Sequence, residues 1–84
     1  MRTPAEQGTI IRTLHHNIAS DYRSAAFHRS DGNEKKALER EADARKTLLY
    51  WVNLVDPGET LLCAYLDAAL QTPVPDDSPL IPKE

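Results

Sequence analysis

This 84-residue sequence has few of the residues that a small β-rich domain needs. It contains only three glycines and five aromatic residues, namely one Trp, three Tyr and one Phe. A small all-β fold requires frequent tight turns and many β-forming side chains, so the composition favours an all-α fold. The hydrophobic content of 40% and the charged content of 27% are ordinary for a folded protein and argue against wholesale disorder. The length limits the chain to a single domain.

Cysteine is also nearly missing, since Cys63 is the only one. A single cysteine excludes an intramolecular disulfide framework and any cluster of cysteines around a metal ion. It fits a reducing compartment best. The first ten residues, MRTPAEQGTI, lack the apolar core of a secretory signal. We therefore expect a cytoplasmic location.

No hydrophobic run is long enough to cross a bilayer. Residues 47–55 carry no charge, but this run is about half of the roughly 20 residues that a membrane-spanning helix needs. Asp56, Glu59 and Asp67 interrupt the apolar sequence that follows. The sequence therefore predicts no membrane span and no membrane partner.

A strong charge of one sign is absent as well, because the formal net charge is only −3. Residues 1–33 carry four arginines against three acidic residues, whereas residues 34–84 carry six basic against ten acidic residues. A protein that binds nucleic acid through phosphates usually presents a basic surface. The balance therefore disfavours nucleic acid as the main partner.

What the sequence does contain is one helix-start pattern repeated three times, as TPAE, DGNE and DPGE. Thr3, Asp31 and Asp56 each offer a side-chain oxygen to the free N–H groups of a first helical turn, and a glutamate follows three positions later. Pro4 and Pro57 fall at the first helical position, where proline is favoured. The pattern predicts three helices, at about residues 4–30, 32–55 and 57–71.

The connections between these helices predict the architecture. The break around Gly32 is short, so the first two helices should form an antiparallel hairpin, with Asp31 or Asn33 capping the second helix. The third helix should pack on this hairpin to give a three-helix bundle within a single domain of residues 1–72. Residues 73–84 form a Pro-rich C-terminal tail, which we expect to be extended.

We find no pattern typical of catalysis or of metal binding. His15 and His16 are adjacent, so on a helix their side chains diverge by about 100°. Cys63 lies within an apolar helical pattern, which is typical of a buried, unreactive thiol. There is no glycine-rich phosphate loop. We therefore expect no enzyme activity, no metal and no cofactor.

The most unusual feature is the amount of apolar surface between residues 47 and 70. In residues 48–55 the apolar side chains point to more than one side of the predicted helix. Either this segment is the centre of the core, or part of it forms an interface with another protein, whose identity the sequence does not give. Trp and Tyr commonly anchor such interfaces. The candidate interface residues are Tyr50, Trp51, Leu54, Leu62 and Tyr65.

The function that this pattern favours is that of a small, non-catalytic protein-interaction module. Such a protein acts sterically as a regulator, adaptor or inhibitor, including the compact inhibitors encoded by phages and mobile elements. A thin bundle with surplus apolar residues is also typical of a homodimer, because two copies can build a shared core.

An alternative function rests on the basic side of the first helix. Arg12, His16 and Arg23 share one side of this helix and are candidate anion contacts. They would suit a small nucleic-acid-associated regulator. The acidic residues Glu6 and Asp21 dilute this charge, so we favour the protein-interaction hypothesis.

Overall fold

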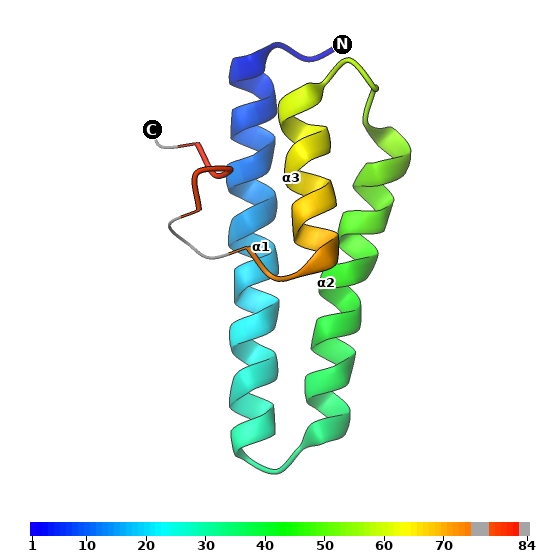
Figure 1. Ribbon diagram of the computed structural model, residues 1–84. Coiled ribbons are helices and arrows are strands. Elements are labelled where there is room, and N and C mark those ends of the chain that lie inside the picture. The colour runs from blue at the N-terminus through cyan, green and yellow to red at the C-terminus, as the bar shows by residue number, and fades with distance from the viewer. Residues whose placement is uncertain (75–77, 83–84) are drawn as a thin grey trace.

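Three helices make up the fold, in the order α1 (Pro4–Ser30), α2 (Glu34–Leu54) and α3 (Thr60–Gln71) (Figure 1). The computed structural model describes residues 1–74 and 78–82, and this part of the chain contains no strand. The prediction of an all-α fold is confirmed. No helix in these two ranges has both the length and the apolar character that a bilayer crossing needs.

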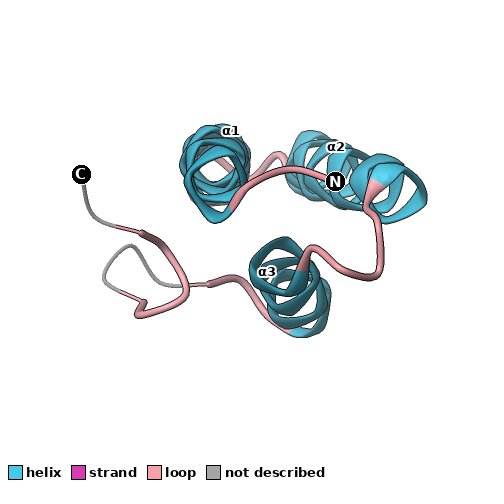
Figure 2. Ribbon diagram, turned by 90° about the horizontal axis from the view of Figure 1, so that it is seen from above, coloured by secondary structure: helices cyan, strands magenta, loops and turns pink. Residues whose placement is uncertain are grey.

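α1 and α2 lie side by side and antiparallel, and α3 packs against one face of this hairpin (Figures 1 and 2). At 1.5 Å per residue, the 27 residues of α1 span about 40 Å and the 12 residues of α3 span about 18 Å. α3 therefore covers only the half of the hairpin that holds the start of α1 and the end of α2. We call this the three-helix half, and the rest, which ends at the α1–α2 turn, the two-helix half.

α1 begins at Pro4, as the capping pattern predicts. The Glu6 backbone N–H donates to Thr3 Oγ1 at 3.2 Å, and the Thr3 N–H donates to Glu6 Oε1 at 3.1 Å. This reciprocal capping box satisfies two donors that the first helical turn leaves free. The bonds to Thr3 also lower the pKa of the Glu6 carboxyl, because they favour its ionised form.

α2 begins two residues later than predicted, at Glu34. Asn33 is its N-cap and accepts a hydrogen bond from the Lys36 N–H at 3.3 Å, whereas Asp31 ends α1. Of the two predicted caps, Asp31 is therefore wrong and Asn33 is confirmed. The chain reverses through Gly32, whose φ of 78° favours glycine because it has no Cβ. At its other end, α2 stops at Leu54, one residue before the predicted boundary.

α3 begins three residues later than predicted, because the DPGE segment forms a turn and not a first helical turn. The Glu59 N–H donates to the Asp56 carbonyl at 2.8 Å, and the Gly58 N–H donates to Asp56 Oδ1 at 3.0 Å. Glu59 becomes the N-cap of α3, without a side-chain capping bond to the helix. The predicted roles of Asp56 as cap and Pro57 as first helical residue are therefore wrong.

The core differs between the two halves of the bundle. In the three-helix half it is built mainly from large side chains, whereas the two-helix half holds the buried alanines Ala25 and Ala37. The alanines allow α1 and α2 to approach closely where no third helix is present. The cluster of buried residues in and next to the three-helix half comprises Ile11, Leu14, Ile18, Ala44, Leu48, Leu62, Tyr65, Leu66 and Ala69.

The described part of the tail packs on the bundle. Val74 and Ile81 are half-buried against the core, and Pro82 lies over Gly8 of α1, where an added Cβ would be 3.4 Å from the proline ring. Residues 78–81 form a turn closed by the Ile81 N–H to the Ser78 carbonyl, so this segment is not extended as predicted. The rest of the predicted extended tail, residues 75–77 and 83–84, lies outside the described residues.

Candidate interaction surface

The exposed apolar side chains gather on α2. Nine large apolar residues of the described chain are exposed, and five of them belong to this helix. Such a concentration of exposed apolar side chains on one element is typical of an interaction surface. The five residues are Leu38, Leu49, Tyr50, Val52 and Leu54.

At the C-terminal end of α2, Trp51 links the core to this surface. Its side chain is half-buried and packs against the core, while the Arg2 guanidinium lies 5.4 Å from the centre of its ring. Tyr50 meets the Trp51 ring edge-on, with 6.4 Å between the ring centres. Tyr50 and Leu54, one helical turn apart, remain exposed by 62% and 47%. We call Tyr50, Trp51 and Leu54 the Trp51 patch.

The structure places two of the predicted interface residues elsewhere. Leu62 and Tyr65 are fully buried, so neither contacts solvent or a partner of the folded chain. Their assignment to an interface is therefore corrected, and both belong to the core. The sequence did not reveal this, because apolar residues occur almost all round α3 and its inward side cannot be identified from spacing alone. Leu61, on the same helix, is the exposed leucine.

Tyr65 joins α3 to α1 through its hydroxyl group. This oxygen lies 3.3 Å from His15 Nδ1, and the two rings meet edge-on with centres 6.2 Å apart. Burial raises the pKa of the Tyr65 phenol to about 12, and the nearby Tyr22 adds to this rise. The phenol is therefore neutral at physiological pH, and the contact positions the two helices.

Beside the Trp51 patch, Arg2 and Glu59 form a partly buried ion pair that sequence reasoning missed. Arg2 Nη1 lies 2.8 Å and 3.0 Å from the two Glu59 carboxylate oxygens, and the Arg2 backbone N–H donates to the same carboxylate. The Glu59 carboxylate also accepts from the Asp56 N–H at 2.7 Å. These bonds, from Asp56 first and then from Arg2, lower the pKa of Glu59. The two residues are 57 positions apart, so no local pattern reveals the pair.

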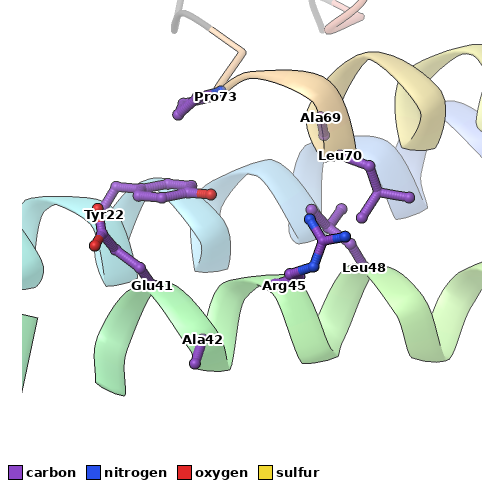
Figure 3. Close-up of a pocket in the computed structure, with 8 residues that line it drawn as sticks. All are labelled: Tyr22, Glu41, Ala42, Arg45, Leu48, Ala69, Leu70 and Pro73. Carbon is purple, nitrogen blue, oxygen red and sulfur yellow. The ribbon is translucent and has the colours of Figure 1, made fainter. Parts of the chain in front are cut away.

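A groove opens where α3 ends and the two-helix half begins (Figure 3). It has a volume of about 350 Å³ and lies open to solvent between α1, α2 and the last turn of α3. This is near the lower limit of typical small-molecule pockets. The residues that line it are mainly apolar, with Glu41 and Arg45 as the charged members: Tyr22, Glu41, Ala42, Arg45, Leu48, Ala69, Leu70 and Pro73.

The three candidate anion contacts lie together on the other side of α1. Arg12, His16 and Arg23 line one groove, with the tail residues Ile81 and Pro82 along its edge. The tail thus covers part of the helix surface from which the basic side chains extend.

In the part of the chain that the structure describes, no three His, Cys, Asp or Glu side chains come together as a metal site. Comparisons of the chain with protein-family models, with curated proteins and with solved structures found no match. The proposals below therefore rest on the residues and their geometry.

Proposed function

We propose that this protein is a non-catalytic interaction module whose Trp51 patch binds another protein. The observation that carries the proposal is the exposure of Tyr50 and Leu54, one helical turn apart, next to a half-buried tryptophan. Tryptophan and tyrosine are the residues that most often dominate binding energy at interfaces.

Contacts on two sides hold the Trp51 patch in place. Trp51 packs on the core from one side and meets the Arg2 guanidinium from the other. Arg2 is itself fixed by Glu59. A surface that is ordered before binding loses less conformational entropy when a partner docks, which favours affinity.

The mode of action that we propose is steric. Apolar contacts at the Trp51 patch provide affinity, and the charged side of α2 provides specificity and a faster association rate. Regulators, adaptors and inhibitors, including those of phages and mobile elements, work in this way. The lone Cys63 is half-buried and fits a reducing compartment such as the cytoplasm.

The test compares two leucines of similar exposure on different helices. Leu54 is 47% exposed within the patch and Leu61 is 48% exposed on α3. The full chain and its Leu54→Glu and Leu61→Glu variants serve as baits for affinity capture from the source organism, followed by quantitative mass spectrometry. We expect a partner that the wild type and Leu61→Glu retain and that Leu54→Glu loses by about tenfold or more. Identical captured proteins for all three baits would contradict the proposal.

A second candidate function is that of a small nucleic-acid-associated regulator, which the shared groove of Arg12, His16 and Arg23 favours. Basic side chains on one groove suit phosphate oxygens. The test measures binding of duplex DNA and of RNA at low and high salt by the wild type and by the Arg12→Glu/Arg23→Glu variant. A complex that salt weakens and the variant lacks supports this function, whereas no complex at low salt excludes it.

A further inference from the structure

A second apolar surface runs along α2 on a different side from the Trp51 patch. Leu38, Ala42, Arg45, Leu49 and Val52 follow one another at steps of four, three, four and three residues, and all five are exposed. This is the spacing of a coiled-coil seam, in which one stripe of a helix faces a second helix. We call these five residues the α2 stripe. Together with Lys35 at its start, it extends over about 26 Å of the helix.

We propose that the α2 stripe pairs with the same stripe of a second copy, with the two helices antiparallel about a twofold axis near residues 43 and 44. This inference specifies the oligomer, whereas the proposed function concerns another partner at the Trp51 patch. The dimer does not depend on that partner.

The apolar residues of the α2 stripe match when the helix is paired with itself in reverse. In this register Leu38 lies opposite Leu49 of the second copy, and the twofold axis repeats the same contact at the other end. Ala42 lies opposite Arg45, so the small alanine leaves room for the long arginine side chain. Val52 lies opposite the aliphatic part of Lys35. Each pair of opposing residues thus places an apolar group of one copy against an apolar side chain, or the aliphatic part of a charged one, from the other copy.

The charges beside the stripe are what identify the occupant as a second copy. Glu39 and Lys46 border the same edge of the stripe, at positions that face each other across an antiparallel pair. Glu39 of each copy therefore meets Lys46 of the other, twice in one dimer. Both side chains are exposed, and neither forms an ion pair with any residue in the described ranges. A parallel pair would lose this match.

Arg45 adds a polar contact near the centre of the dimer. Its own copy provides no ion pair for it among the residues described, and it extends over the groove at the end of α3 (Figure 3). In the antiparallel register it lies one residue from Glu41 of the second copy. That carboxylate already accepts from Arg29 at both oxygens, at 2.9 Å and at 3.5 Å, and each carboxylate oxygen can accept a further hydrogen bond. A charged residue within an apolar seam is a common means of fixing register.

The test uses charge reversal, because antiparallel pairing makes a specific prediction. Glu39→Lys places lysine opposite lysine in both pairs, and Lys46→Glu places glutamate opposite glutamate. We expect each single variant to raise the dimer dissociation constant by about tenfold or more in sedimentation velocity at low salt. An equimolar mixture of the two variants should form a heterodimer, and the double variant Glu39→Lys/Lys46→Glu should regain wild-type affinity.

Two leucine variants separate this inference from the proposed function. Leu49→Glu should abolish the dimer while circular dichroism shows an unchanged helix content, and Leu54→Glu should leave the dimer intact. Conversely, the partner of the Trp51 patch should still bind Leu49→Glu.

Four results would overturn the inference. The first is a wild-type protein that stays monomeric at the highest soluble concentration. The second is a dimer that Leu49→Glu leaves intact. The third is a pair of charge variants that do not associate when mixed. The fourth is a monomeric wild type whose binding to another protein is lost in Leu49→Glu, since the stripe would then belong to that protein.

Discussion

The two halves of the bundle are held together by different means. In the three-helix half, large side chains such as Leu48 and Leu66 fill the space between three helices. In the two-helix half the small residues Ala25 and Ala37 are buried, which permits α1 and α2 to approach closely. Ion pairs from Arg29 to Glu34 and Glu41 support that half on its exposed surface. The comparison shows that a short third helix is enough to complete the core, because the part of the hairpin that it leaves uncovered has few large apolar side chains to bury.

The largest expected effect comes from the core of the three-helix half. Leu66 is 1% exposed, and truncation to alanine leaves a cavity among close-packed side chains. We expect Leu66→Ala to lower the free energy of unfolding by about 2–5 kcal/mol, measured by urea denaturation. Leu61→Ala on the exposed side of α3 is the control and should change it by about 0.5 kcal/mol or less. Equal losses from both variants would contradict the assignment of the inward side of α3.

The next effect tests the close contact in the two-helix half. Ala25 is 1% exposed and its neighbour Ala26 is exposed. Ala25→Leu forces extra volume between α1 and α2, and we expect a loss of about 1–3 kcal/mol in the free energy of unfolding. Ala26→Leu adds the same atoms on the solvent side and should have little effect. If Ala25→Leu is as stable as the wild type, the two helices are not held by alanine contacts.

The smallest expected effect is on the pH dependence of stability, to which the ion pairs of the two halves contribute differently. The pKa values of Glu59 and Glu34 are both lowered, the first by hydrogen bonds from Asp56 and Arg2 and the second by Arg29. A carboxyl with a lowered pKa in the folded state stabilises the protein above its unfolded pKa of about 4.5, and this stability is lost as the pH falls through the lowered value.

We therefore expect Glu59→Gln to reduce the fall in melting temperature between neutral pH and pH values below 4.5. Glu34→Gln should reduce it less, because the Glu34 carboxylate is exposed and water screens its pair with Arg29. Thermal melts followed by circular dichroism across this pH range measure both. A larger effect of Glu34→Gln would show that the exposed pairs stabilise the fold more than the partly buried Arg2–Glu59 pair does.

Local chemistry predicted the fold well where the chain uses only neighbouring groups. Thr3 and Glu6 cap α1 with each other, and Asn33 caps α2, as the sequence indicated. At Asp56 the same logic was right only in part. The Glu59 carboxylate accepts from the Asp56 N–H as the pattern indicated, but the segment forms a turn and α3 begins later, at Thr60. The Glu59 carboxylate also binds Arg2, 57 positions away, which a four-residue pattern cannot reveal.

The candidate site was predictable only in part, for a related reason. Tyr50, Trp51 and Leu54 lie near the surface, but Leu62 and Tyr65 do not, since the inward side of α3 depends on how it docks on the hairpin. The sequence did not identify Leu38 and Leu49 as interface residues, because a single leucine on a helix is as common in a core as on a surface. Their regular spacing indicates an interface only when the structure shows that both side chains are exposed and lie outside the core.

The turn at Gly32 has a consequence for changes in chain length. Nothing outside its neighbours lies within 4 Å of an added Cβ at this glycine, and the turn lies at the end of the bundle farthest from α3. Extending a loop costs only about 0.6 kcal/mol for each doubling of its length. A spacer, a protease site or a small reporter peptide inserted between Asp31 and Asn33 should therefore leave the helices assembled, which makes this turn the natural place to label the protein.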